Sequence, residues 1–167
     1  MLDTHLLHPK VVHFTVALLT MALLFEVLRL VTKKEMFGEA ARWNMIFGGL
    51  AAIVTFATGL LAESHVVIAG GAKEVFEHHE TFGYITMILA VVLLIWHLAP
   101  GRLYRRFYSF YLVILVAVVV SLSVGAYYGG RLVYDFGVGV GMKSGAIEKQ
   151  TVPDNSAVPG TSSSEND

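Results

Sequence analysis

The chain has 167 residues, of which 55% are hydrophobic and only 15% are charged. Soluble domains are usually about a quarter charged, so this balance favours a protein embedded in lipid. The formal net charge of −1 gives no basic field for binding nucleic acid. The absence of cysteine excludes disulfides, iron–sulfur clusters, thiolate metal sites and covalently attached c-type haem.

Four apolar segments are long enough to cross a bilayer, which takes about 20 helical residues. They cover residues 11–31, 43–62, 80–99 and 107–128. Because the connections are short, neighbouring helices should be antiparallel, and the sequence predicts an all-α, up-down four-helix bundle integral to the membrane. The first segment contains Glu26 and Arg29 and lacks a cleavage site, so we expect a retained span rather than a signal peptide.

Basic residues predict the orientation of the bundle, because positive charge is enriched in cytoplasmic loops. Most lysines and arginines near the spans flank the first and third connections: Arg29, Lys33, Lys34, Arg42, Arg102, Arg105 and Arg106. We therefore expect these two connections in the cytoplasm and both termini outside.

A glycine-rich segment follows the fourth span. Five glycines within residues 129–141 indicate irregular backbone, and the apolar residues between them predict packing onto the outer mouth of the bundle. The membrane domain is therefore expected to cover residues 1–142. Residues 143–167 are polar and are expected to form a disordered tail.

Six of the seven histidines are expected on the outer side, and two of them open spans that run in the same direction. Each is followed by a small residue one turn later and by a threonine two turns later, which places the three residues on one helical face. The two sets are His13, Ala17 and Thr20, and His79, Gly83 and Thr86. The first and third helices of such a bundle are diagonal, so these faces should meet across the core.

This histidine pair predicts a site for a flat cofactor. Haem iron commonly takes axial imidazoles, and cofactor sites in bundles are built from facing helices. We expect one haem b with His13 and His79 as axial ligands. The small residues expected around it are Ala17, Gly83, Gly59 and Gly125. The alternative is that each histidine is interfacial and contacts lipid headgroups or water.

The remaining polar residues support weaker hypotheses. His8, His65 and His78, with nearby carboxylates, could bind a transition metal outside the membrane, although no His-Glu-x-x-His motif occurs. His97 has no histidine at its depth and is expected to make an interfacial contact beside Trp96. Glu26 is expected to pair with Arg29 near the cytoplasmic interface. No catalytic residue is indicated.

Several motifs resemble a known bacterial family. They are His8-Pro9-Lys10-Val11-Val12-His13-Phe14, His79-Glu80, Gly129-Gly130-Arg131-Leu132-Val133-Tyr134 and Gly137-Val138-Gly139-Val140. Over about residues 5–142 the chain resembles the small four-helix membrane proteins called domain of unknown function 2231. The resemblance implies a bacterial cytoplasmic membrane location. Some members are joined to cytochrome c-like domains, which implies an electron-transfer setting.

Three functions stay open at this point. The first is a b-type cytochrome that exchanges electrons with a quinone or a separate c-type cytochrome. The second is a non-catalytic membrane subunit or anchor, and the third is a protein that binds or transports a transition metal. In each case the chain contacts the lipid bilayer and could form a homo-oligomer. We do not expect a stand-alone enzyme or a nucleic-acid partner.

Overall fold

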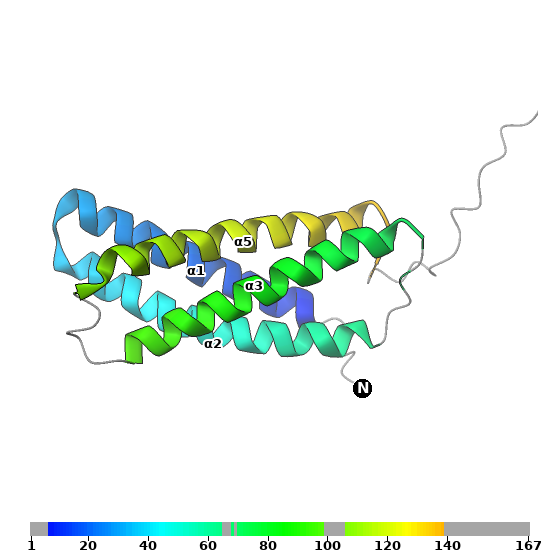
Figure 1. The fold of residues 1–167 in the computed structure, drawn as a ribbon, viewed down its shortest axis with the longest axis horizontal. Coiled ribbons are helices and arrows are strands. Elements are labelled where there is room, and N and C mark those ends of the chain that lie inside the picture. The colour runs from blue at the N-terminus through cyan, green and yellow to red at the C-terminus, as the bar shows by residue number, and fades with distance from the viewer. Residues whose placement is uncertain (1–6, 65–67, 69, 99–105, 139–167) are drawn as a thin grey trace, which may run out of the picture.

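The described part of the chain forms a bundle of four long helices (Figure 1). The computed structural model describes residues 7–64, 68, 70–98 and 106–138. The helices are α1 (Leu7–Thr32), α2 (Glu35–Glu63), α3 (Ala72–Leu98) and α5 (Tyr108–Tyr134). Each of the four is long and apolar enough to cross a membrane. The predicted all-α membrane bundle is therefore confirmed.

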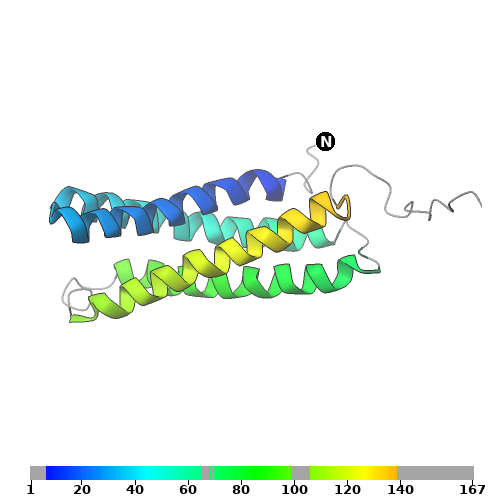
Figure 2. The same ribbon diagram turned by 90° about the horizontal axis from the view of Figure 1, so that it is seen from above.

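The helices form two pairs, α1 with α2 and α3 with α5, and the two pairs lie one above the other in Figure 2 (Figures 1 and 2). α1 and α3 each pack against both α2 and α5. Within these described helices, no Cα atom of α1 lies within 8 Å of α3, and none of α2 lies within 8 Å of α5. The helices α1 and α3 are therefore diagonal and run in the same direction, as the short connections predicted.

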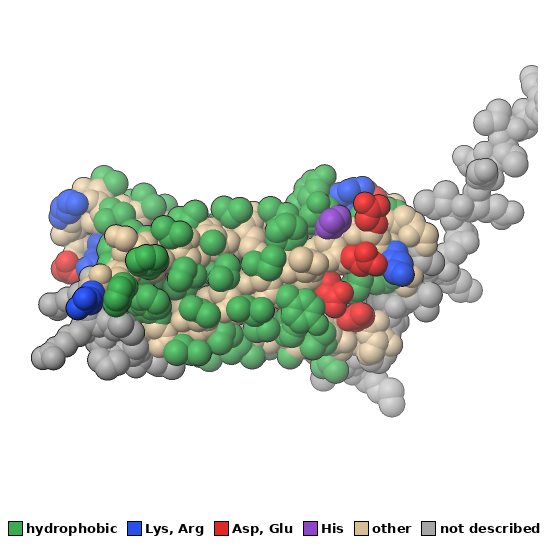
Figure 3. Space-filling view, in the orientation of Figure 1, with side chains coloured by type: hydrophobic (Ala, Val, Ile, Leu, Met, Phe, Trp, Pro, Cys, Tyr) green, Lys and Arg blue, Asp and Glu red, His purple; other side chains and the backbone are tan. Residues whose placement is uncertain are grey.

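The two ends of the bundle differ in chemistry. We call the end that contains His8 and His79 the histidine end, and the end that contains Lys33 and Lys34 the basic end. The first described helix, α1, begins at the histidine end, and the last described helix, α5, finishes there (Figure 1). Between the ends, apolar side chains cover the outer surface (Figure 3), including Phe110, Val113 and Val31. Exposed apolar area on this scale is costly in water and suits contact with lipid.

Each helix extends beyond the apolar segment that predicted it. α1 begins at Leu7 rather than at residue 11, and α5 continues to Tyr134 rather than ending at residue 128. The prediction of irregular backbone from residue 129 is therefore wrong as far as Tyr134. The helix is followed by Gly137, whose φ of 66° favours glycine.

Near the end of α5, Leu132 is buried in a small cluster with Ala72 and Val75 of α3. Of the described residues after α5, Val138 packs against this cluster. The tail proposed for residues 143–167 lies outside the described residues.

Two adjacent glycines let α2 approach both of its neighbours. A Cβ atom on Gly48 would lie 2.8 Å from Leu19 Cδ2 of α1, and one on Gly49 would lie 3.1 Å from Leu94 Cβ of α3. Small residues at helix crossings allow close backbone packing, which is a main source of helix association in lipid. The position of α2, and with it the spacing of the diagonal helices, depends on these two residues.

We therefore expect Gly48→Ala to destabilise the bundle relative to Gly83→Ala, because the buried Leu19 side chain cannot move away freely. Overpacking of this kind typically costs about 1–3 kcal/mol. Thermal unfolding followed by circular dichroism in detergent measures the effect. Gly83→Ala is the matched control, because its Cβ atom would meet no heavy atom within 4 Å. Equal unfolding midpoints for the two variants would contradict this account.

Candidate functional site

Two histidines from the diagonal helices meet at the histidine end of the bundle. His8 of α1 and His79 of α3 are both half-buried. Their ring centroids are 6.4 Å apart, and the ring planes are inclined at 80°. Because α1 and α3 do not pack against each other, these two side chains reach toward one another across the bundle axis.

Both imidazoles are held by a backbone carbonyl of the adjacent helix. His8 Nδ1 donates to Thr55 O of α2 at 2.9 Å, and His79 Nδ1 donates to Gly125 O of α5 at 2.8 Å. A carbonyl oxygen can only accept, so Nδ1 carries the hydrogen in both rings, and in a neutral ring Nε2 then keeps its lone pair. Histidines that bind metals are commonly oriented in this way, with the second ring nitrogen bonded to a backbone carbonyl.

Each imidazole also lies against a glycine. A Cβ atom on Gly59 would lie 3.1 Å from His8 Cε1, and one on Gly129 would lie 2.9 Å from His79 Cε1. Gly59 follows Thr55 by one turn, and Gly129 follows Gly125 by one turn. The two rings therefore have the same surroundings, which consist of a carbonyl partner and, one turn later, a glycine that leaves room for the ring.

A layer of hydroxyl groups lies below the histidines. Thr15 Oγ1 and Thr55 Oγ1 are 2.7 Å apart and link α1 to α2. Thr86 donates to Ser121 Oγ at 2.9 Å and links α3 to α5. Hydroxyl groups that bond across helices strengthen association in lipid. This layer supports the two histidine-bearing helices from the side facing the membrane centre.

His13, the predicted partner of His79, does not face the core. It is exposed, as are Ala17 and Thr20, and its Nδ1 bonds to Pro9 O of its own helix at 2.6 Å. The predicted inward face of α1 is therefore wrong. His8 lies five residues before His13 on α1, and five residues turn an α-helix by about 140° beyond one full turn. Since His8 faces the core, His13 faces away from it.

The other predicted positions lie closer to their expected places. On α3, His79 and Gly83 are half-buried and Thr86 is buried, so the predicted inward face of this helix is confirmed. Gly59 and Gly125 also lie at the level of the histidines, as expected. No heavy atom approaches the Cβ position of Gly83 within 4 Å, so this position, one turn after His79, is open.

The described part of the structure gives no support to the hypothesis that His8, His65 and His78 bind a transition metal with nearby carboxylates. Within the described residues, no three His, Asp or Glu side chains gather as a metal site. His78 is exposed and stacks on Tyr128, with ring centroids 5.0 Å apart. His65 lies outside the described residues. The histidine pair is thus the better-defined candidate for a ligand.

An acidic hollow opens at the same end of the bundle. It has a volume of about 340 Å³, and it is lined by Glu63, Ile68, Lys73, Phe76, Glu77 and Glu80. The space-filling view shows carboxylates gathered at this end (Figure 3). The lining has three carboxylates and one lysine, so this surface has a negative potential that would favour a positively charged binding partner.

A family model described as a predicted membrane protein (DUF2231) matches residues 4–142. The chain belongs to this family. The DUF2231 match covers all four helices and both histidines of the pair. No curated protein and no solved structure matches the chain. The family description states a membrane location and no activity, so the function of this DUF2231 protein has to be argued from its site.

Proposed function

We propose that this DUF2231 protein is a membrane electron-transfer component that binds one b-type haem through His8 and His79. The observation that carries the proposal is the pair of facing imidazoles, each held by a helix carbonyl. Two imidazole nitrogens that are each about 2 Å from one metal ion put their ring centroids roughly 6 Å apart. The centroid separation of 6.4 Å is close to that value.

The number of ligands favours haem over a bare metal ion. Structural zinc sites use four protein ligands, and catalytic zinc sites use three. The described residues offer His8 and His79 without a third converging ligand. Haem iron takes its equatorial nitrogens from the macrocycle and needs only axial ligands from the protein. A two-histidine donor set therefore suits haem better.

The chain's own residues would hold and orient this group. His8 and His79 would supply the axial nitrogens, while the carbonyls of Thr55 and Gly125 fix the ring orientation and raise the basicity of Nε2. On α3, one turn after His79, the Cβ position of Gly83 has no heavy atom within 4 Å. A bound haem would supply one-electron transfer at this end of the membrane.

The acidic hollow suggests the kind of redox partner. Complementary charge steers association and selects partners, so a positively charged protein such as a c-type cytochrome fits this surface. We therefore place the histidine end outside a bacterial cytoplasmic membrane, in agreement with the basic connection at Lys33 and Lys34. A quinone in the bilayer is the other carrier that could reach a site at this depth.

The absorbance spectrum of protein purified from haem-replete bacterial membranes tests the proposal. We expect Soret and α bands that correspond to one haem per chain. A spectrum without these bands would contradict it. Elemental analysis of the same sample would then separate the alternatives, because stoichiometric zinc or copper supports metal binding, whereas neither metal nor haem supports a subunit or anchor.

A further inference from the structure

The bundle consists of two similar helical hairpins. Inward-facing positions of α1 correspond to inward-facing positions of α3 after a shift of 71 residues. The pairs are His8 and His79, Thr15 and Thr86, Leu19 and Ala90, Ala22 and Leu93, and Glu26 and His97. Inward-facing positions of α2 recur in α5 after 70 residues: Ala41 and Tyr111, Met45 and Leu115, Gly48 and Val118, Thr55 and Gly125, and Gly59 and Gly129. Because α1 and α3 run in the same direction, this is a parallel repeat.

Polarity follows the same pattern in both hairpins. The inward faces begin with a histidine, carry a threonine seven residues later, and are apolar over the next two inward positions. Eighteen residues after the histidine, each face again has an ionisable side chain, which is Glu26 in α1 and His97 in α3. Ionisable residues inside membrane spans are costly and usually functional. Their presence at equivalent positions points to a second site, at the basic end.

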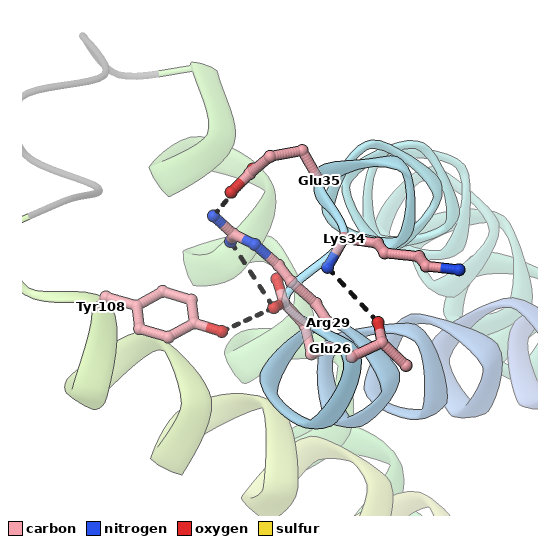
Figure 4. Close-up of polar contacts among 6 residues, drawn as sticks. Glu26, Arg29, Lys34, Glu35 and Tyr108 are labelled. Atoms are coloured by element: carbon pink, nitrogen blue, oxygen red, sulfur yellow. Dashed lines mark hydrogen bonds and ion pairs between the residues drawn. The ribbon is translucent and has the colours of Figure 1, made fainter.

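The carboxylate of this second site is enclosed by polar partners (Figure 4). Glu26 is fully buried. Tyr108 of α5 donates its hydroxyl hydrogen to Glu26 Oε2 at 2.7 Å, and Arg29 Nη1 lies 3.8 Å from the same oxygen. Arg29 also pairs with the exposed Glu35 of α2 at 3.3 Å. Glu26 therefore shares its cation with a second carboxylate, which weakens the hold of Arg29 on its charge.

Two tyrosines of α5 connect Glu26 to His97. The rings of Tyr108 and Tyr111 stack with centroids 6.1 Å apart, and the ring of Tyr111 packs against His97 at 5.1 Å. Arg42 of α2 lies close enough to His97 to act on its charge. The charged and titratable groups linked to Glu26, directly or through these rings, thus come from all four helices: Arg29, Glu35, Arg42, His97, Tyr108 and Tyr111.

An apolar layer separates this group from the histidine end. Its buried members include Leu19, Ala22, Met45, Ala90, Leu93, Leu115 and Val118. On α1 the layer spans the ten residues between Thr15 and Glu26, whose Cα atoms are about 16 Å apart along the helix. Any exchange at Glu26 therefore takes place with the basic-end side of the membrane.

We infer that Glu26 and Tyr108, with Tyr111 and His97 beside them, form a proton-binding site that exchanges with the basic-end side. The half-buried Tyr108 joins the buried carboxylate to the interface. As a proton enters, the O–H bond of Tyr108 breaks while the bond from that proton to Glu26 Oε2 forms. In the same step the phenol oxygen regains a proton from a hydronium ion at the interface, which leaves as water. This site does not depend on the presence of haem.

Infrared difference spectroscopy of the protein in lipid nanodiscs tests the inference. On acidification from about pH 8 to about pH 5, the range in which biological proton switches operate, we expect the C=O band of a protonated carboxylic acid to appear. The band is lost in Glu26→Gln and retained in Glu39→Gln, which removes an exposed carboxylate of α2. Tyr108→Phe shifts it to higher frequency, because the hydrogen bond from the phenol is gone.

Identical difference spectra for the wild type and Glu26→Gln would overturn the inference, because Glu26 would then stay ionised as a structural partner of Arg29. A band that depends on Glu26 but is unmoved in Tyr108→Phe would overturn the proposed route through Tyr108. Circular dichroism checks that each variant keeps its helices, and the Tyr108→Phe result stands even where Glu26→Gln fails to fold.

Discussion

We expect His8→Ala and His79→Ala each to remove the haem absorbance proposed for the purified protein, and His13→Ala to leave it unchanged. The first two variants delete a proposed axial ligand from the histidine pair. The third deletes an exposed imidazole of the same helix, which bonds only within α1 among the contacts described. The ratio of Soret absorbance to protein absorbance in detergent measures the effect. We expect it to fall by about tenfold or more in the two ligand variants.

The three variants together distinguish the pair His8 and His79, which the structure brings together, from the pair His13 and His79, which the sequence favoured. Loss of haem in His13→Ala with retention in His8→Ala would contradict the structural assignment. Retention of haem in all three variants would contradict any role of these residues as axial ligands. Because each variant replaces one imidazole with alanine near the same end of the bundle, a general effect on expression is expected to be similar for all three.

The sequence predicted the fold because the dominant signal in a membrane bundle is the length of each apolar segment. Four such segments with short connections leave few arrangements, and the diagonal relation of α1 and α3 follows directly from that order. The inward face of α3 was also recovered, because His79, Gly83 and Thr86 are spaced so that they share one helical face.

The inward face of α1 was missed for a physical reason. In lipid both the outer and inner faces of a helix are apolar, so hydrophobic periodicity does not mark the core. The prediction began α1 at residue 11 and so left His8 outside the helix. A usable signal was present in Glu26, because an ionisable side chain deep in a span usually faces the bundle interior. Glu26 lies five turns after His8 and therefore on the same face as His8, not His13.

The repeat explains why one bundle can present two different sites. The two hairpins supply equivalent positions, so each polar level is built from one residue of α1 and one of α3. At the histidine end both positions hold imidazoles, and the site is nearly symmetric. At the basic end the same positions hold a carboxylate and an imidazole, and two tyrosines of α5 fill the space between them. Equivalent positions of the two hairpins thus carry different chemistry at the two ends of the bundle.

The second large effect is expected from Gly129, which packs against the ring of His79 but would not itself bind the haem iron. In Gly129→Ala the new Cβ atom would lie 2.9 Å from His79 Cε1 and 3.1 Å from Nδ1, so the ring has to move. Movement strains the hydrogen bond from His79 to Gly125 O, which orients the imidazole. Loss of such an outer contact typically lowers metal affinity by about 10-fold to 100-fold. Titration of the apoprotein with haem, followed at the Soret band, measures the change.

Gly130→Ala is the control for this variant. It makes the same chemical change one residue along α5, but its Cβ atom would come no closer than 4.0 Å to a neighbouring side chain, that of Tyr134. Both variants gain the same helix propensity, about 1 kcal/mol per glycine replaced by alanine, so a difference in haem affinity reports on the ring of His79 alone. Equal affinities in the two variants would show that the position of this ring does not govern binding, and the axial role of His79 would then be contradicted.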